Sequence, residues 1–507
     1  MIIVLKHKLV DHREVISVFR KALDIVRGIR ESKLESTNII RALECGYVEP
    51  GPSGALTRGK IDILPTGRNF YAIDPLSIPT KAAWKIGVET ANMIINRYLK
   101  KHGRYPESIG HVLWSIDAYK SDGEQISQIL YLLGVKPIWD ESERIKGVEV
   151  IPLDKLGRPR IDCVVRISGI VRDTLPNYIY LIDDAISKVI SLDESLNMNY
   201  PKKHYIEHVR KLIENGRGKG EAEELAKFRV FCSPPGSYGT GVNYAVEASA
   251  WKNDEDLAKT WIQWSSYGYS RRSSGKFSPE SLILSLKSVD VVTRNHISDE
   301  HDIFGCCCYF AYHGGFYNTV KAISERDNVE LVFTDTRDIS RLEVRDGKLE
   351  IERIVRSKLL NPVWISEMKK HGYRGANEFS RKILHLYGWS ATTKLVSDWV
   401  FSEISRVYAL NEEMKKWFMK NNIYAFEEIL RRLLEAAERD LWKAPEDILN
   451  KLREIYSEVE GILEEGLSGE YEIQGGTINI VSIDDVESWK KNAEEVLLIW
   501  KKLKEGE

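Results

Sequence analysis

The sequence has 507 residues, 43% of them hydrophobic and 29% charged, which is the composition of a folded protein with room for roughly two to four domains. Its 73 basic and 75 acidic residues give a formal net charge of −2, which argues against bulk attraction to nucleic acid or to an anionic membrane. No run of about 18 apolar residues occurs, so no transmembrane helix is predicted. The apolar stretch at residues 1–10 is too short and too interrupted for a signal peptide, and we expect a cytoplasmic location.

The first 80 residues are predicted to form a helix followed by a long loop. Residues 1–45 carry an apolar stripe at helical spacing, formed by Val15, Val18, Phe19, Leu23 and Val26. From residue 48 to 79, Pro, Gly and small residues replace this pattern. We expect the loop to be ordered because it is dense in side chains that functional loops use, among them Arg58, Arg68, Asn69, Tyr71 and Asp74.

Residues 81–195 show an α/β pattern. Strands are predicted at 109–116, 135–139, 148–153 and 161–167, and helices at 123–133 and 173–190. Alternating strands and helices are typical of a parallel sheet covered by helices. Ligands bind at the carboxyl ends of such strands, so residues 117–123 and 168–173 are expected near a cleft.

The remaining chain is predicted as two further units. Residues 196–340 begin with a polar helical connection and become rich in Gly, aromatic residues and His, while residues 341–507 are mainly helical. The strongest helical pattern covers residues 424–442, and a hairpin around Gly475 and Gly476 precedes a last amphipathic helix with Trp489, Val496, Leu497, Trp500 and Leu503. The predicted fold class is α/β and multi-domain, with units at 1–80, 81–195, 196–340 and 341–507.

Three short motifs have both a functional and a structural interpretation. The stretch 54–61 nearly matches a phosphate-binding P-loop but has Ile61 at the Ser/Thr position, so no ATP site is predicted in this chain. His204 and His208 lie in an H-x-x-E-H pattern of inverted zinc peptidases, although the basic residues around it are typical of a solvated helix. The glycines of 236–241 fit either a tight turn with positive φ or close approach of the backbone to a flat ligand.

The richest cluster of polar functional side chains lies between residues 295 and 315. It contains Asn295, His296, Asp299, Glu300, His301, Asp302, Tyr309, Tyr312 and His313. A surface turn is the structural interpretation, but this density of imidazole, carboxylate and phenol favours metal binding or proton transfer. The cysteines are Cys45, Cys163, Cys232 and the run Cys306, Cys307 and Cys308. Adjacent cysteines of a strand would face opposite sides, and no CxxC pair occurs, so neither a disulfide scaffold nor a common zinc site is predicted.

Several blocks occur in an order that is characteristic of one family. They include GPSGALTRG at 51–59, LPTGRNFYAID at 64–74, IPT at 78–80, LGRPRID at 156–162, RISGIVRD at 166–173, GSYGTG at 236–241, EHD at 300–302, HGG at 313–315, NPVW at 361–364, KHGYRG at 370–375 and WSATT at 389–393. Over roughly residues 40–445 the chain resembles the large subunit of cobaltochelatase, the CobN type of class I metal chelatase. The large subunit of magnesium chelatase is similar.

The resemblance implies insertion of Co²⁺ or Mg²⁺ into a tetrapyrrole such as a corrin or porphyrin precursor. It implies that ATP is hydrolysed by separate AAA+ subunits, with a MIDAS-type subunit as a further partner, and is not bound by this chain. On this hypothesis, metal delivery or proton removal is assigned to Glu300, His301, Asp302 and His313, and the predicted metal ligands are His301, Asp302 and His313. The residues expected to hold the macrocycle are Arg68, Asn69, Asp74, Arg172 and Tyr238.

Two departures from the family pattern bear on this hypothesis. Family chains are much longer, so either a separately encoded N-terminal half completes the protein or its role is reduced. The acidic run that follows the His-Asp pair in the family is replaced here by Gly305 and the three cysteines, which predicts a softer metal or no chelation. The alternative function is a non-catalytic tetrapyrrole carrier, metal carrier or scaffold, and a zinc peptidase is the third.

Overall fold

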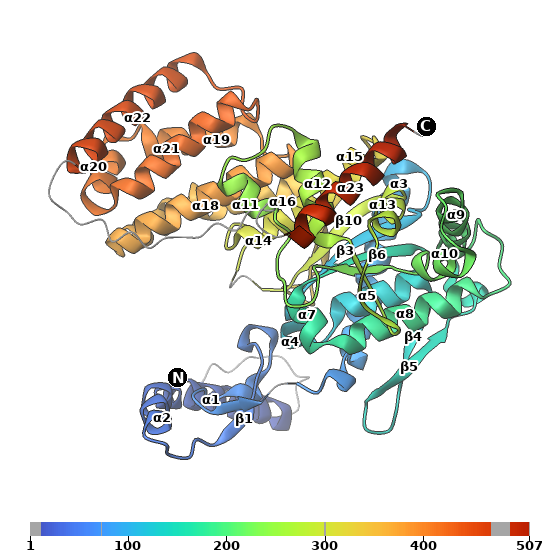
Figure 1. Ribbon diagram of the computed structural model, residues 1–507. Coiled ribbons are helices and arrows are strands. Elements are labelled where there is room, and N and C mark those ends of the chain that lie inside the picture. The colour runs from blue at the N-terminus through green and yellow to red at the C-terminus, as the bar shows by residue number, and fades with distance from the viewer. Residues whose placement is uncertain (1–11, 72, 299–300, 468–486, 506–507) are drawn as a thin grey trace.

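The computed structural model describes residues 12–71, 73–298, 301–467 and 487–505. Its centre is an eight-stranded sheet whose five middle strands are parallel, with antiparallel strands at both edges (Figure 1). The strands, from one edge to the other, are β12 (Glu343–Asp346), β11 (Glu330–Asp335), β10 (Val289–His296), β3 (Ser108–Leu113), β6 (Asp162–Ile167), β7 (Val230–Cys232), β8 (Tyr267–Ser270) and β9 (Ser273–Phe277). The predicted α/β class is confirmed.

Helices cover both faces of this sheet because successive residues of a buried strand point to opposite sides. Leu113 and Val165 belong to the core beneath one face, and Val112 and Val164 belong to the core beneath the other. The first face is covered by α3 (Lys81–His102), α5 (Glu124–Leu133) and α8 (Pro176–Ile190). The second is covered by α9 (Tyr200–Glu214), α10 (Lys219–Leu225), α12 (Asp254–Ser265), α13 (Pro279–Lys287) and α15 (Gly315–Ser324).

The sheet takes strands from both sides of residue 195. β3 and β6 come from the region 81–195, whereas β7, β10 and β11 come from 196–340. The boundary placed at residue 195 therefore lies inside one sheet, since β6 pairs in register with β7.

Two predicted strands lie outside the main sheet. β4 (Val135–Trp139) and β5 (Ile145–Val150) pair with each other as a separate antiparallel ribbon, so their assignment to the parallel sheet was wrong. The physical reason is the short connection: Asp140 accepts hydrogen bonds from the amides of Ser142 and Arg144, both at 2.9 Å. A turn this tight joins only antiparallel strands, because a parallel pair needs a crossover of a dozen or more residues.

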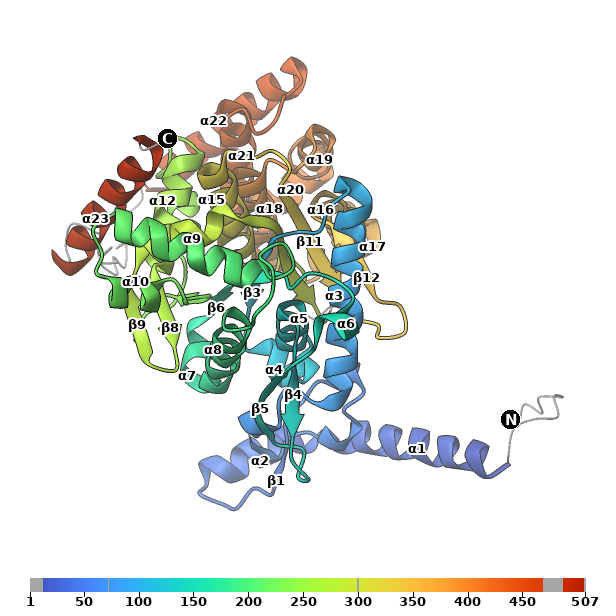
Figure 2. The ribbon, with the colours of Figure 1, turned by 90° about the vertical axis from the view of Figure 1, so that its right-hand side faces the viewer.

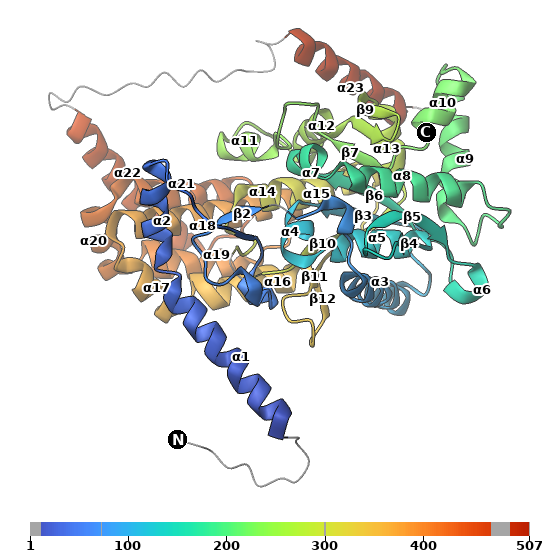
Figure 3. The same cartoon turned by 90° about the horizontal axis from the view of Figure 1, so that it is seen from below.

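The N-terminal segment extends away from the sheet. α1 (His12–Glu31) projects outward, and α2 (Leu34–Leu43) follows it beside a short strand pair, β1 (Pro50–Pro52) and β2 (Asn69–Tyr71) (Figures 2 and 3). Helical structure was predicted for residues 1–45: the described part forms the two helices α1 and α2, and residues 1–11 lie outside the described residues. The apolar stripe of α1 does not face a core within the described residues, since Phe19 is 67% exposed and Val18 is 68% exposed. Periodicity identifies the apolar side of a helix and says nothing about what covers it.

The C-terminal region is helical, as predicted. Its helices are α16 (Gly347–Ile354), α17 (Pro362–Lys369), α18 (Gly372–Thr393), α19 (Asp398–Ile404), α20 (Glu412–Asn421), α21 (Ile423–Glu438), α22 (Glu446–Leu467) and α23 (Glu487–Glu505), and π-helical turns occur at Val355–Leu359 and Ser405–Ala409. α18 joins this region to the sheet, and α23 returns to pack beside α12 and α13 (Figure 1). The hairpin predicted around Gly475 and Gly476 lies outside the described residues. No helix in the described ranges combines the length and apolarity that spanning a membrane requires.

Candidate functional site

The carboxyl ends of the five parallel strands meet along one edge of the sheet. Three short helices follow β3, β6 and β10 there, α4 (Ile116–Ser121), α7 (Gly169–Thr174) and α14 (Cys307–Tyr309) (Figure 1). The segments 117–123 and 168–173 lie at this edge, where the sequence places them. Open parallel sheets bind ligands at such an edge, because the loops there are free to vary.

The long N-terminal loop is fastened to this edge by ion pairs. The guanidinium of Arg58 donates to the carboxylate of Glu124 and to the carbonyl oxygen of Thr336, and Lys60 pairs with Asp122 at 2.6 Å. Both cations of the P-loop-like stretch are therefore taken by partners within the protein. The stretch 54–61 therefore anchors the loop to the edge of the sheet.

Three residues predicted to hold a macrocycle lie in or next to this loop, and two of them make hydrogen bonds or ion pairs within the protein. Arg68 donates to the carbonyl oxygens of Pro65 at 3.1 Å and Asp62 at 2.8 Å. Asp74 caps the amide of Leu76 at 3.0 Å and pairs with Arg144. Asn69 is exposed on β2. None of Arg68, Asn69 and Asp74 lines the cavity described below, and their role in ligand binding stays a prediction.

Arg172 and Tyr238 lie at the same edge but hold a loop of the protein. The guanidinium of Arg172 donates to the carbonyl oxygens of Ser233 at 3.2 Å, Pro234 at 2.6 Å and Ser237 at 3.1 Å. Tyr238 donates to Asp173 at 2.7 Å. A buried arginine whose donors meet backbone carbonyls fixes the conformation of the 233–241 loop, so a role for Arg172 in ligand binding also stays a prediction.

The glycines of the 233–241 loop were predicted either to form a tight turn or to let the backbone approach a flat ligand. Gly236, Gly239 and Gly241 have φ values of 79°, 103° and 75°, which side chains rarely adopt. A Cβ atom on Gly241 would lie 2.5 Å from the indole nitrogen of Trp264. The turn interpretation therefore explains these glycines, and the approaching group is a tryptophan of the chain itself.

His301 and Asp302 line a cavity of 450 Å³ at the carboxyl edge. The other walls come from the C-terminal region, namely from the π-helical turn with Lys358, from α17 with Trp364 and Met368, and from the start of α18. This volume lies within the roughly 300–1,000 Å³ of ligand sites in proteins. Of the residues predicted from the sequence, this cavity brings together His301 and Asp302.

Asp302 is held between two ammonium groups inside the cavity wall. Its carboxylate pairs with Lys358 and with Lys382, the latter at 3.1 Å, and accepts the amide hydrogen of Phe304 at 2.7 Å. Burial by itself raises the pKa of Asp302, but the two lysines outweigh it and the pKa is lowered. Asp302 therefore carries a full negative charge that is already compensated within the protein.

The cavity as a whole is positively charged, which the sequence did not reveal. Its cations are Lys358, Arg374, Arg381 and Lys382, and its anions are Asp302 and Glu378. Both carboxylates are paired with Lys382, and Arg381 reaches Glu378 only at 4.0 Å, so the guanidinium groups at the rim can also serve an anionic ligand. The sequence signal that could have identified these cavity residues was the pair of blocks 361–364 and 370–375, which contribute Trp364, His371, Arg374 and Gly375 to the wall.

A niche of 40 Å³ adjoins this cavity and shares His301 with it. Arg294 is buried there, stacked between Trp114 at 3.9 Å and Tyr309 at 4.3 Å from the ring centroids. Both polar atoms of the Asn295 amide are buried without a hydrogen-bond partner among the described residues. A buried amide without a partner is unusual in a native protein and indicates a missing polar group. The niche is large enough for a water or one small polar substituent.

His313 lies in the protein core, away from the cavity wall. It is fully buried in the π-helical turn Phe310–Gly314, with its ring against Phe333 and Trp389. Burial lowers the pKa of His313 to about 3, so the ring is neutral. Its role as a metal ligand stays a prediction, while its position is that of a core residue. Glu300 lies outside the described residues.

The H-x-x-E-H helix faces the core with its histidines. His204 contacts carboxylates through both ring nitrogens, Asp162 at 2.8 Å and Glu107 at 3.2 Å, and His208 is buried beside it. Glu207 is exposed. A zinc peptidase would need ring nitrogens and the glutamate directed to one open site, and the described side chains place them on opposite sides. His204 is therefore a structural residue of this fold.

Replacing His204 by alanine is expected to lower the free energy of unfolding by about 2 kcal/mol at pH 6, because Asp162 and Glu107 lose a charged hydrogen-bond partner. Burial lowers the pKa of His204, but its hydrogen bonds to Asp162 and Glu107 outweigh burial and raise it. This contribution is complete below the unfolded pKa of about 6.5 and is lost as the pH rises through the folded value. Urea unfolding at pH 6 and pH 9 measures it.

The exposed Glu207, replaced by alanine, is the matched control and should change stability by less than about 0.5 kcal/mol. Stoichiometric zinc in the wild-type chain that disappears in the His204→Ala variant would contradict the structural role.

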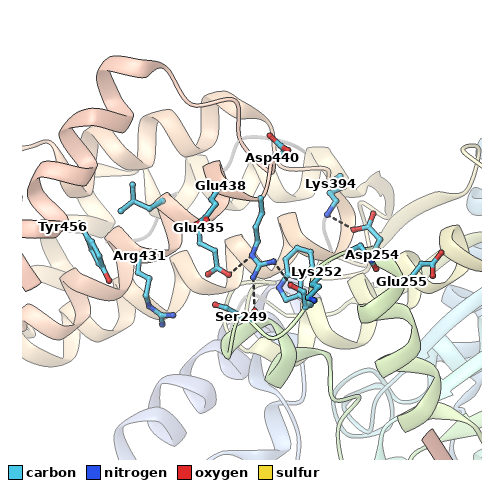
Figure 4. A pocket seen from close by; sticks show the side chains of 14 residues that line it. Ser249, Lys252, Asp254, Glu255, Lys394, Arg431, Glu435, Glu438, Asp440 and Tyr456 are labelled. Carbon is cyan, nitrogen blue, oxygen red and sulfur yellow. Dashed lines mark hydrogen bonds and ion pairs between the residues drawn. The ribbon is translucent and has the colours of Figure 1, made fainter. Parts of the chain in front are cut away.

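A wider cleft lies elsewhere, between residues 249–255 and the helices α21 and α22, and measures 1330 Å³ (Figure 4). Its charges are largely paired with each other: Lys394 with Asp254 at 2.8 Å, and Arg439 with Glu435 at 2.8 Å. None of the residues predicted from the sequence lines it. We therefore place the candidate site in the smaller cavity, which contains an excess of cations, His301 and Asp302.

Comparisons with known proteins agree with the sequence blocks. At the sequence level, the chain is 48% identical to protein MJ1441 of Methanocaldococcus jannaschii over 93% of this chain and 37% of that protein. It is 33% identical to the aerobic cobaltochelatase subunit CobN of Pseudomonas aeruginosa over 88% of this chain and 36% of that subunit. It is 36% identical to the chloroplastic magnesium-chelatase subunit ChlH of Oryza sativa over 83% of this chain and 30% of that subunit.

The fold has a solved counterpart. The catalytic subunit of cobaltochelatase from Mycobacterium tuberculosis superposes with a TM-score of 0.80 and 34% identity, over 84% of this chain and 36% of that one. The chain thus spans about a third of the length of the relatives it matches. The family model described as CobN/Magnesium Chelatase matches residues 5–449. By this match and by its relatives, the chain belongs to the CobN/Magnesium Chelatase family.

Proposed function

We propose that this chain is part of the large subunit of a metal chelatase that inserts Co²⁺ or Mg²⁺ into a tetrapyrrole, and that the macrocycle binds in the 450 Å³ cavity beside His301 and Asp302. The observation that carries the proposal is the cavity itself: it combines an imidazole, a fixed carboxylate and an excess of cations at the carboxyl edge of the sheet. Family membership supports the reaction class.

The cavity offers the groups that metal insertion requires. Two pyrrole N–H protons must leave the ring and the ion must shed water, so a proton acceptor has to lie near the ring. His301 is exposed at the junction of the cavity and the niche, and its imidazole is the proposed acceptor. Asp302 is anchored by its lysines and fixes the position of the loop that carries His301.

The macrocycle is proposed to be oriented by charge and stacking. Arg374 and Arg381 at the rim suit the peripheral carboxylates of a tetrapyrrole, since guanidinium and carboxylate form paired hydrogen bonds. Trp364 in the wall presents an aromatic surface to a flat ring. The niche with Arg294 and the unpartnered Asn295 suits one further polar substituent of the same ligand.

The energy source is proposed to lie on other chains. Arg58 and Lys60 of the P-loop-like stretch are occupied by Glu124 and Asp122. We therefore assign ATP hydrolysis to separate AAA+ subunits, with a MIDAS-type subunit completing the enzyme. The part of the relatives that this chain does not span is proposed to contribute to the macrocycle site as well.

A second candidate function is a tetrapyrrole or metal carrier without insertion activity. It is favoured by one observation, the three neighbouring thiols of Cys306, Cys307 and Cys308 next to the cavity, which can hold a metal ion without inserting it. The two functions differ in one measurement: a carrier binds the ring but does not metallate it when partner subunits and ATP are supplied.

Titration of the purified chain with metal-free rings tests the proposal. We expect a saturable change in ring absorbance with a corrin of the hydrogenobyrinate type or with a protoporphyrin, at one ring per chain, because a cavity of 450 Å³ has no room for a second ring. Binding should weaken at high salt, since cations at the rim contribute to it. Absence of any saturable change with both rings would refute macrocycle binding by this chain.

A further inference from the structure

Three thiols gather where the chain leaves the carboxyl edge of β10. Cys306 is extended, with φ −151° and ψ 141°, and the next residue begins α14, so the chain turns sharply at this point. The sulfur atoms of Cys306, Cys307 and Cys308 all lie within 4.8 Å of one another. The prediction that neighbouring cysteines point to opposite faces was wrong, because it assumed a strand and the structure has the start of a helix.

This group is distinct from every other set of potential ligands in the described part of the chain. No other three His, Cys, Asp or Glu side chains there bring their ligand atoms within the same distance. All three cysteines are free thiols and half-buried, so a small ion can reach them. The candidate cavity is adjacent, since Gly305 lines it and immediately precedes Cys306.

Polar groups of the chain surround the three sulfur atoms. The sulfur of Cys306 accepts the amide hydrogen of Cys308 at 3.4 Å. The carboxylate of Glu247 interacts with the thiol of Cys307, and the imidazole of His385 lies near Cys306. Thiolates are the form of cysteine that binds metals.

We propose that Cys306, Cys307 and Cys308 form a three-thiolate binding site for a soft divalent cation such as Zn²⁺, Co²⁺ or Cd²⁺. A tetrahedral ion with metal–sulfur bonds of about 2.3 Å holds its sulfurs ~3.8 Å apart, so the observed cluster needs to contract by less than about 1 Å. Each thiol that coordinates releases one proton, for which Glu247 and water are the available acceptors.

Three protein ligands leave one coordination position open. Sites of this kind exchange their fourth ligand, whereas structural zinc sites are closed by a fourth side chain. Thiolates also discriminate against Mg²⁺, which prefers oxygen ligands. If the ring binds beside Gly305, as proposed above, the cluster would present the incoming ion at the edge of the macrocycle; this second part rests on the proposed function.

The test is a titration of the full chain, reduced and freed of metal, with Cd²⁺ alone. We expect one equivalent to bind with an ultraviolet thiolate-to-metal charge-transfer band, and excess Mg²⁺ to leave the band unchanged. The triple variant Cys306→Ser, Cys307→Ser, Cys308→Ser should lose the band, and Cys307→Ser alone should bind at least about 10- to 100-fold more weakly. Cys45→Ser, which removes an exposed single thiol, is the matched control and should behave as wild type.

Circular dichroism and thermal unfolding establish that each variant is folded. If the triple variant does not fold, the Cys307→Ser variant still tests the site. A wild-type chain that shows no charge-transfer band, or a band that persists in the serine variants, overturns the site. Metal-free ring titration of the same variants separates the two proposals. Unchanged ring binding with lost Cd²⁺ binding supports the thiolate site, and Cd²⁺ binding without ring binding refutes only the proposed function.

Discussion

Replacing Asp302 by alanine is expected to lower the free energy of unfolding by about 3–5 kcal/mol, because it leaves buried ammonium groups without their counter-charge. Lys382 is the more affected partner, since 5% of its side chain is exposed against 27% for Lys358. The loop 301–305 would also lose the hydrogen bond between Asp302 and the amide of Phe304. Guanidinium chloride unfolding, followed by circular dichroism and by fluorescence to check that both transitions coincide, measures the change.

Two further variants distinguish a structural role of the Asp302 carboxylate from a role in metal insertion. Asp327 is fully exposed, and Asp327→Ala should change stability by less than about 0.5 kcal/mol. Asp302→Asn retains the oxygen that accepts from Phe304 but not the charge, so we expect a smaller loss than for alanine. If Asp302→Ala unfolded within about 1 kcal/mol of wild type and yet abolished metal insertion, the carboxylate would act on the ion or the ring and not as an anchor.

Reversing the charge of Arg374 and Arg381 together is expected to weaken binding of a carboxylated tetrapyrrole by about 100-fold at low salt. The estimate assigns roughly tenfold, about 1.4 kcal/mol, to each guanidinium–carboxylate contact. The effect should shrink as salt is added, because both side chains lie at the solvent-exposed rim. Ring absorbance titrations of the Arg374→Glu, Arg381→Glu variant at two salt concentrations measure it.

The matched control is Arg453→Glu, the same charge change on an exposed position of α22 that does not line the cavity. The variant His301→Ala should affect metal insertion and not ring binding. Its ring affinity should stay within a few-fold of wild type. Its rate of metal insertion, measured with the partner subunits, should fall by about 100-fold or more, as expected for loss of a general base. Wild-type ring affinity in the double arginine variant would remove the cavity from the proposal, and wild-type insertion by His301→Ala would remove the imidazole from the mechanism.

Local pattern was sufficient for much of the fold. The helices α5, α8 and α21 and the strand β6 lie close to where periodicity predicts them, because a buried face recurs every 3.6 or 2 residues along the chain. The positions of segments 117–123 and 168–173 at the ligand-binding edge also followed, since the carboxyl ends of parallel strands share one edge. The ordered sequence blocks were sufficient to assign the family, because that assignment depends on residue identity and order alone.

The composition of the candidate site was decided by tertiary contacts. Asp302 is paired with lysines 56 and 80 residues further along the chain, and no spacing rule connects them. Arg172 is equally polar in the sequence, yet its guanidinium donates to Asp173 and to carbonyl oxygens of the 233–241 loop more than 60 residues away. The apolar stripe of α1 is a further example, since its periodicity predicted a helix but could not predict that the stripe is exposed.

The sequence by itself thus determined the family, the α/β class and the segments that carry polar chemistry, because these depend on residue type and on neighbours along the chain. Only the tertiary structure decided which polar side chains are hydrogen-bonded or ion-paired within the protein and which are available to a ligand. Hydrogen bonds and ion pairs saturate, so a side chain's availability depends on partners that folding brings from distant positions. The three cysteines illustrate both parts: the sequence places them together, and the turn into α14 turns their sulfurs toward one another.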